Sequence, residues 1–444
     1  MKKLHQIKEE IEKYKKLAKK SLMYAKKIGA DEAEINIKSA EGLRVSSLNK
    51  STENIESEEG ISLTIKIIKD KKKGSASTAK LNNIDIEKTI DAAYSIANVT
   101  ERDEYIGLAD PELLMQTKQQ DLELCFPSNV DSEFLKKMAF NCEEGILENK
   151  ARSNGCQVNA IKHWMIYGNT NDFLEGTAKT TYSVSGTAIA DLDKIYREQD
   201  YTISKNIDQL VNPYLIGSEA AKKAFARKGA CKIKTQKLPI IFKNSVASGI
   251  ISSIAGAING YRLYKKDSFL LDKINQQITN KDISIYENPH IISGWGSRLY
   301  DSEGVATRPR TIIENGILKT YILDSYSAKR LNMQTTGNCG GITNWIVSNN
   351  GISYADLLKK MDKGLLITGL IGHGTNLTNG DYSRGAEGFY IENGKIKHPV
   401  DEITIASNLK NMLLQITSID NEPDSRLQVS SGSILINEMQ ISGS

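Results

Sequence analysis

Gly60-Ile61-Ser62-Leu63-Thr64-Ile65-Lys66-Ile67-Ile68 alternates apolar and polar side chains along most of its length. Such alternation is typical of a β-strand that buries one face and exposes the other. Apolar side chains recur at helical spacing before it, from Ile7 to Ile28, and after it, from Ile84 to Ala97. The order helix, strands, helix predicts an α+β domain with helices packed on antiparallel strands.

The remaining sequence predicts two domains. Residues 98–129 are polar and irregular and indicate a connecting segment. Helices are expected over 134–149 and 213–228, and strands over 158–161, 164–168, 177–189 and 201–203. Because the composition changes at 231–239, we predict an N-terminal α+β domain over 1–230, with 1–125 and 126–230 as candidate subdomains. The C-terminal domain, 231–444, is predicted to be largely antiparallel β with a few helices.

Turn signals dominate the C-terminal domain. Asn315-Gly316 and Asn393-Gly394 each lie between apolar runs. Asn-Gly at such a place predicts a type I′ hairpin, which needs positive φ at both residues. A strand is expected over 239–242 and helices over 245–258, 325–331, 354–363 and 405–416.

Composition excludes several classes of partner and compartment. The 444 residues contain 58 Lys+Arg and 54 Asp+Glu, a balance that predicts no nucleic-acid partner. The five scattered cysteines form no Cys-x-x-Cys pair, so we predict no disulfide framework and a cytoplasmic location. No apolar run approaches the ~20 residues of a membrane span, and no signal-peptide core follows the N-terminus, so no membrane contact is predicted.

Glycines are dense from Ile371 to Phe389, where His373, Asp381, Arg384 and Glu387 stand among them. This density predicts backbone that turns sharply or lies close to another chain. An ordinary turn-rich connection is the alternative. For His373, a loop histidine bonded to nearby backbone is the favoured interpretation.

Side chains for catalysis are scattered. The five histidines are far apart in sequence, so a zinc site would have to assemble from single residues. Asp301 and Glu303, ahead of Arg308 and Arg310, are a candidate acid–base pair. Ion pairing of these acids with the arginines is the favoured alternative.

A series of short motifs runs through the C-terminal half. In order they are Asp267-Ser268-Phe269-Leu270, Asp301-Ser302-Glu303-Gly304, Glu314-Asn315-Gly316-Ile317-Leu318, Tyr326-Ser327-Ala328-Lys329-Arg330-Leu331, Thr336-Gly337-Asn338, Gly380 to Phe389, Glu392-Asn393-Gly394, Thr404-Ile405-Ala406-x-Asn408-Leu409, Asn437-Glu438-Met439 and Ile441-Ser442-Gly443. On these motifs the chain resembles the PmbA/TldE branch of the TldD/PmbA family of metallopeptidases, also described as modulators of DNA gyrase. The N-terminal half matches that family more weakly, mainly by its pattern of elements.

The resemblance bears directly on metal binding. In the TldD branch, a His-Glu-x-x-x-His helix and a later cysteine hold a zinc ion. The matching positions here are Ile251, Ser252 and Gly256, with Ser431 near the cysteine position. Isoleucine and glycine cannot ligate zinc. The resemblance therefore implies no catalytic residue, metal or cofactor in this chain, and zinc in a TldD-like partner.

The resemblance also implies a heterodimer with a TldD-like subunit, in which an unfolded peptide is cut at the zinc of the partner. A homodimer is the alternative assembly when that partner is absent. The candidate peptide-binding residues are His373, Gly380, Asp381, Tyr382, Ser383 and Arg384. Backbone amides of 380–385 would pair with the peptide by strand addition, and Arg384 would bind a carboxylate or carbonyl.

Two other functions stay open. One is a peptidase with a site of its own, built on Asp301 and Glu303 or on His373. The other is a binding or regulatory protein, such as a modulator of DNA gyrase or of a toxin–antitoxin system.

Overall fold

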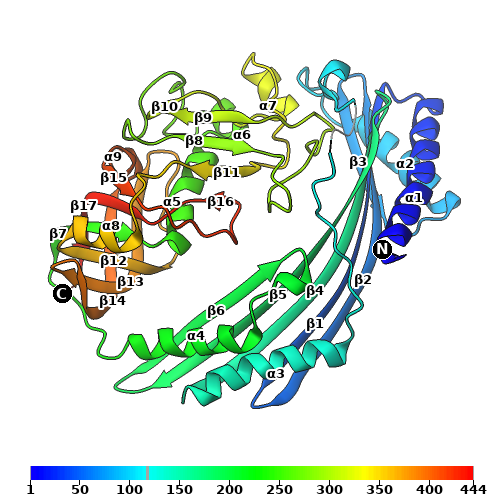
Figure 1. Cartoon of the computed structure of the whole chain (residues 1–444). Helices are drawn as coiled ribbons and strands as arrows, with labels where there is room; N and C mark the ends of the chain where they lie inside the picture. Colours follow the sequence, from blue (N-terminus) through cyan, green and yellow to red (C-terminus); the bar gives the residue numbers. More distant parts are fainter. Residues whose placement is uncertain (1, 117–119, 444) are drawn as a thin grey trace. The chain divides into compact units, whose positions relative to one another are not determined.

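The computed structural model describes residues 2–116 and 120–443 (Figure 1). The chain is an α+β protein, as its sequence predicts, and it divides into two compact units. Unit 1 comprises Met1–Phe225 and Leu299–Thr307, and unit 2 comprises Ala226–Arg298 and Arg308–Ser444. Within the described ranges, no helix is both long and apolar enough to cross a membrane.

Unit 1 is built on one antiparallel sheet of strand order β3-β2-β1-β4-β5-β6. Its strands are β1 Glu32–Leu48, β2 Ser51–Lys69, β3 Lys72–Thr78, β4 Arg152–Asn169, β5 Leu174–Asp191 and β6 Ile195–Ser204. The separate strands predicted at 158–161 and 164–168 are wrong, because both belong to β4. Lys162 and His163 stay in register with β1 and β5, so the ladder continues through the predicted break.

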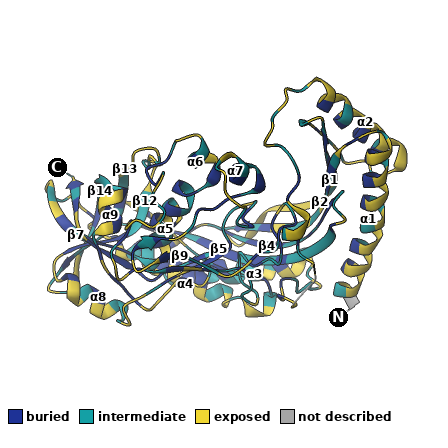
Figure 2. Cartoon of the chain, turned by 90° about the horizontal axis from the view of Figure 1, so that it is seen from above, coloured by how far each residue is buried: buried dark blue, intermediate teal, exposed yellow. Residues whose placement is uncertain are grey.

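Helices cover one face of this sheet. They are α1 Lys2–Lys27, α2 Asn83–Val99 and α3 Ser132–Glu148. Alternate strand residues such as Ile35, Ile65 and Trp164 form a core with the apolar stripes of α1 and α2. Figure 2 shows the exposed outer side of α1. A further helix, α4 Pro213–Ala226, crosses α3 so closely that a Cβ at Gly217 would lie 1.8 Å from the Cys142 carbonyl oxygen. Two short 3-10 helices, Pro111–Leu113 and Ile207–Gln209, complete unit 1.

The opposite face, which we call the helix-free face, is largely polar. Residues 299–307 cover part of it, where Tyr300 and Val305 pack against Tyr167 and Phe173. Along β5 this face presents half-buried Thr177, Lys179, Thr181, Ser183, Ser185 and Thr187. The sheet therefore has one apolar and one hydrophilic side, as the alternation in β2 predicts.

Two features of β1 and β2 are not apparent from sequence. The turn between them has positive φ at Asn49 and Lys50, whose amides donate at 2.7 Å to the buried carboxylate of Glu143 in α3. Residues 51–60 of β2 are exposed at every position, and β3 pairs only with Leu63–Lys69. This first part of β2 is therefore a free sheet edge among the described residues, and it carries four glutamates, Glu53, Glu56, Glu58 and Glu59.

Unit 2 contains two sheets, of order β10-β9-β8-β11-β16 and β14-β13-β12-β7-β17-β15. Pairings are antiparallel except β12–β7 and β11–β16. The strands are β7 Gln236–Phe242, β8 Ile285–Asn288, β9 Arg310–Glu314, β10 Ile317–Leu318, β11 Asn344–Val347, β12 Gly364–Ile371, β13 Asp381–Glu392, β14 Lys395–Asn408, β15 Ile416–Ile419, β16 Val429–Ser430 and β17 Ile434–Ser442. The helices are α5 Asn244–Ala257, α6 Gly260–Tyr264, α7 Ser325–Arg330, α8 Tyr354–Met361 and α9 Leu409–Leu414.

In unit 2 the Asn-Gly signals predicted two hairpins correctly, whereas apolar periodicity placed the start of one helix wrongly. Asn315-Gly316 and Asn393-Gly394 have positive φ at both residues, which confirms the two hairpins. The helix predicted over 405–416 is wrong in its first turn, because Ile405 pairs with β13 and β17 inside a sheet. The helix begins only after Asn408, whose side chain accepts a hydrogen bond from the Lys410 amide.

Candidate functional site

Helix α5 carries three of the four positions that correspond to zinc-site residues in the resembling family. It follows β7 directly and contacts β7, β12 and β16. Ser431, the fourth position, comes directly after β16. The structure therefore brings α5 and the segment that ends at Ser431 together.

None of these positions offers a zinc ligand. Ile251 is fully buried in the apolar core of unit 2. The exposed Ser252 donates its hydroxyl to the Ser248 carbonyl at 2.7 Å, and the buried Ser431 donates to the Gly432 carbonyl at 2.9 Å. Zinc in proteins is held by imidazole, thiolate and carboxylate groups. The residues at this place do not fit a zinc ion.

The loop between β12 and β13 packs against α5 at the remaining position, Gly256. A Cβ at Gly256 would lie 2.8 Å from Cδ1 of Leu377. The loop is tied down because the Phe269 amide donates to the Leu377 carbonyl at 2.9 Å. A side chain at Gly256 would therefore meet the end of Leu377, and the loop that leads into the glycine-rich segment lies beside α5.

The glycine-rich segment is a strand from Asp381 onward and not a loop. β13 pairs with β12 on one side and with β14 on the other. Beyond the end of β12, the Ser383 amide donates to the Gly374 carbonyl at 2.7 Å, and the Asn376 amide donates to the Asp381 carbonyl at 2.8 Å. The predicted strand addition by a peptide at 380–385 is therefore wrong, because both sides of this backbone are already paired.

Close backbone approach occurs at two glycines, within this chain and not to another chain as the glycine density predicted. A Cβ at Gly374 would lie 1.5 Å from the Ser383 carbonyl oxygen, and one at Gly388 would lie 1.9 Å from that of Leu366. Any larger residue would force these strands apart. The neighbours are segments of the same chain.

Three of the candidate peptide-binding residues lie at the surface. His373, Asp381 and Ser383 are exposed, whereas Gly380 is buried at the start of β13 with φ of 89°. The Asp381 carboxylate accepts hydrogen bonds from the side-chain amides of Asn379 at 2.6 Å and Asn408 at 3.1 Å. Asp381 therefore stabilises the entry into β13.

Tyr382 and Arg384 lie on the other side of β13. Burial raises the pKa of Tyr382 to about 12, and the Arg384 guanidinium opposes this effect because its charge favours the phenolate. The Tyr382 hydroxyl and Nε of Arg384 are buried and make no hydrogen bond of normal geometry with the described residues. Arg384 as a whole is only partly buried, so the exposed part of its side chain lies at the surface.

The acids of the alternative site have structural contacts. Asp301 is 2 % exposed, and its carboxylate accepts from the backbone amides of Glu303 at 2.8 Å and Val305 at 3.0 Å. In unit 2, Arg310 forms an ion pair of 3.3 Å with Glu287, its cross-strand partner in β8. Sequence analysis missed this pair because no local pattern links β8 to β9.

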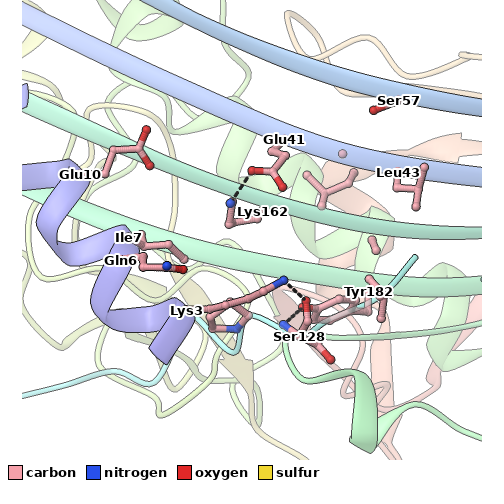
Figure 3. A pocket seen from close by; sticks show the side chains of 15 residues that line it. Lys3, Gln6, Ile7, Glu10, Glu41, Leu43, Ser57, Ser128, Lys162 and Tyr182 are labelled. Atoms are coloured by element: carbon pink, nitrogen blue, oxygen red, sulfur yellow. Dashed lines mark hydrogen bonds and ion pairs between the residues drawn. The ribbon is translucent and has the colours of Figure 1, made fainter. Parts of the chain in front are cut away.

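A pocket of about 510 Å³ lies in unit 1 beside α1 (Figure 3). It is lined by Lys3, Gln6, Ile7, Glu10, Glu41, Gly42, Leu43, Ser57, Pro127, Ser128, Val130, Ala160, Ile161, Lys162 and Tyr182. Lys162 pairs with Glu41 at 2.5 Å, and Lys3 donates to the Ser128 carbonyl at 3.2 Å. These polar groups of the wall bind each other, and the pocket contains none of the predicted site residues.

Comparisons with known proteins cover nearly the whole chain. Residues 235–443 match the model of the PmbA/TldA metallopeptidase C-terminal domain, and residues 33–97 match PmbA/TldA metallopeptidase domain 1. A metalloprotease PmbA homolog of Haemophilus influenzae is 40% identical over 94% of each chain. Metalloprotease PmbA of Escherichia coli O157:H7 is 38% identical over 93% of each chain.

Two crystal structures have the same fold. A Bacteroides thetaiotaomicron protein, proposed to be a modulator of DNA gyrase, superimposes with a TM-score of 0.92 at 27% identity, over 97% of this chain and 99% of its own. TldE from Thermococcus kodakarensis superimposes with a TM-score of 0.84 over 96% of this chain and 100% of its own. Its identity is 22%, so this likeness concerns the fold alone.

Proposed function

Because the chain belongs to the PmbA/TldD family of metallopeptidases, we propose that it is the non-catalytic, PmbA/TldE-like subunit of a two-subunit metalloprotease. A TldD-like partner supplies the zinc ion and the catalytic residues, and unfolded peptides are the substrates. One observation carries the proposal: the two ligand positions of α5 hold a buried isoleucine, Ile251, and a glycine, Gly256, and neither side chain can bind zinc.

The remaining task of this subunit is to hold the peptide. Exposed His373 and Ser383 offer side-chain contacts, and Arg384 offers a guanidinium donor. A guanidinium binds carboxylates and carbonyls through charge-assisted hydrogen bonds. Because the backbone of 380–385 is already paired, the side chains bind the peptide in this proposal.

The test compares the purified chain, a His-Glu-x-x-x-His paralogue from the same genome, and their equimolar mixture. Zinc content, size in solution and cleavage of unfolded casein are measured for each. We expect zinc in the paralogue only, a heterodimer in the mixture, and full cleavage only there. Ser252→Ala, at the position of the missing glutamate, should leave cleavage unchanged, whereas Arg384→Gln should raise KM several-fold. Stoichiometric zinc in this chain together with cleavage by this chain alone would overturn the proposal.

A second candidate function is regulation of DNA gyrase, because the Bacteroides thetaiotaomicron protein is proposed to modulate that enzyme. Affinity capture from a lysate separates the two functions. Recovery of a TldD-like protein supports the protease subunit, and recovery of gyrase supports the regulator. Cleavage by the chain alone that His373→Gln or Asp301→Asn abolishes would instead support a peptidase with a site of its own.

A further inference from the structure

The first part of β2, residues 51–60, leaves one side of its backbone unpaired. β1 pairs with its other side, and the pairing of β3 with β2 begins only at Leu63. No other segment of the described chain pairs with these residues, and a Cβ at Gly60 would meet no atom within 4 Å beyond its two chain neighbours. Because alternate residues of a strand turn their amide and carbonyl groups to the same side, a row of donors and acceptors faces outward here.

The side chains along this edge carry negative charge only. Residues 51–60 contain four glutamates and neither lysine nor arginine. Within the described ranges, Glu56 alone of the four forms an ion pair, 3.1 Å long, with Arg44 in β1. Glu58 and Glu59 are exposed and, as neighbours in a strand, point to opposite faces of the sheet. A strand added at this edge would therefore meet uncompensated carboxylates on both of its faces.

The pocket beside α1 reaches this edge at Ser57. Leu43, the cross-strand partner of Ser57 in β1, lies next in the lining, and Ala160 of β4 pairs with Leu43 on its other side. Tyr182 of β5, the partner of Ala160, is the last lining residue in this row. Figure 3 shows the row crossing the strands from Ser57 through Leu43 to Tyr182. The helix-covered face of the sheet thus has a hollow, with an apolar floor, that extends to the free edge.

A residue that paired with Ser57 from outside would turn its side chain to the same face as Ser57, at the end of this hollow. Ile55, two residues away on that face, is 42 % exposed and would pack against the same side chain. We propose that residues 51–60 bind a basic, extended segment of an unfolded peptide as an added β-strand, with one apolar side chain in the pocket. The inference rests on the proposed function and names the class of substrate segment that this subunit holds.

The charge of the edge selects the occupant. Charged side chains on a free edge often serve to keep other strands away, and these glutamates would repel the same edge of a second copy. They attract a strand that carries lysine or arginine, so the same charges discriminate between the two partners. An edge that is protected by charge alone needs neither an exposed isoleucine nor a hollow beside it. Ile55 and the pocket therefore favour a docking edge for a basic peptide.

The test uses fluorescent ten-residue peptides that alternate threonine with lysine, with a phenylalanine in place of one central lysine. A second peptide has glutamate in place of lysine, and a third is the lysine peptide with its four central amides N-methylated. Fluorescence anisotropy measures their binding to the full chain, alone and with the TldD-like subunit. We expect the lysine peptide to bind on the order of tenfold more tightly than the glutamate peptide, because opposite charges stabilise cross-strand pairs. N-methylation removes backbone donors and should weaken binding by about tenfold or more.

Variants of the exposed edge separate the contributions of charge and pocket. Glu58→Lys together with Glu59→Lys should abolish the preference for the lysine peptide. Glu87→Lys together with Glu219→Lys is the matched control, because both residues are exposed on helices of unit 1, and it should leave the preference unchanged. Leu43→Ala should weaken binding of the phenylalanine-containing lysine peptide several-fold, and it should not affect a peptide with alanine at that place.

Hydrogen exchange locates the bound peptide. Strand addition engages the outward amides of residues 51–60, so exchange there should slow when the lysine peptide binds. Residues 63–69 already pair with β3 and should show no change, which makes them an internal control. Protection of 51–60 that depends on the concentration of this chain alone would assign the edge to a second copy and overturn the proposal.

The outcomes distinguish this inference from the proposed function. Equal affinity for the three peptides, or binding without protection of 51–60, overturns the edge as a peptide site. Cleavage of unfolded casein by the mixture tests the proposed function separately, so either proposal can fail alone. Loss of the heterodimer in the Glu58→Lys, Glu59→Lys variant, with no peptide bound by the wild type, would assign the edge to the partner subunit and overturn this inference.

Discussion

Arg227 is the residue whose loss should most clearly weaken unit 2. It is 3 % exposed, and its guanidinium donates to the carbonyl oxygens of Gly388 at 2.9 Å and Val400 at 3.0 Å. Gly388 and Val400 are cross-strand partners in β13 and β14, next to a bulge that follows Ala386. A third contact, to the Glu387 carboxylate, is 3.4 Å long. Arg227 therefore joins the two strands where their ladder is irregular.

Arg227→Met keeps most of the aliphatic length and removes every donor. Two buried carbonyls then lose a hydrogen-bond partner, at about 1–3 kcal/mol each. The Glu387 pair is long and partly exposed, so it adds little. We expect a loss of about 2–5 kcal/mol in the free energy of unfolding of unit 2. Arg227→Lys should lose less stability than Arg227→Met, because it keeps the positive charge. It should still be less stable than the wild type, because lysine cannot span both carbonyls with a rigid fork.

Urea unfolding followed by tryptophan fluorescence measures this loss. A Trp164→Phe background removes the tryptophan of unit 1 and leaves Trp295 and Trp345 to report on unit 2. Lys237→Met is the control, because its 2.9 Å ion pair with Glu438 is exposed and should be worth less than about 1 kcal/mol. Equal unfolding midpoints for Arg227→Met and Lys237→Met would refute the reasoning.

Three further predictions concern unit 1. Glu143→Gln should lower the free energy of unfolding by about 2–4 kcal/mol and speed hydrogen exchange in the β1–β2 turn, because the Glu143 carboxylate accepts hydrogen bonds from two backbone amides. Glu144→Gln, on the same helix, should change neither the stability nor the exchange. Gly217→Ala should lower the melting temperature by several degrees, since its Cβ would lie 1.8 Å from the Cys142 carbonyl oxygen; a wild-type melting curve would contradict this. The pKa of Lys205 is about 8 in the folded chain, against 10.5 for an unperturbed lysine. Between pH 8 and 10.5 the unfolded chain therefore binds more protons, so the free energy of unfolding should rise with pH by at most about 3 kcal/mol. Lys205→Met should flatten that rise in urea titrations at successive pH values.

Local patterns were sufficient for much of the fold. The alternation in β2 and the two Asn-Gly turns depend on neighbours in sequence, and both are confirmed. Ile405 looked helical and lies in a strand, because pairing with β13 and β17 outweighs its local preference. Arg227 and Glu143 gave no signal, because their partners are distant in sequence.

The candidate site was predicted in part. Glycine density indicated close approach to another chain, and the structure shows close approach at Gly374 and Gly388 to this chain's own backbone. The sequence could not show which segment lies close to these glycines. The neighbouring backbone belongs to the same chain, and this pairing removes strand addition at 380–385 as a way of binding a peptide. The contact of Leu377 with Gly256 also depends on how a loop packs on a helix, and no periodicity reports that.

The free edge of β2 has a consequence for solubility. An exposed strand edge is a template on which a second molecule can add its own strand. Here residues 51–60 place four glutamates along that edge, so two copies that approached edge to edge would bring like charges together. At neutral pH this repulsion opposes the growth of one sheet into another. Neutral side chains in place of these glutamates would remove the repulsion and leave an edge on which a second molecule could add its strand.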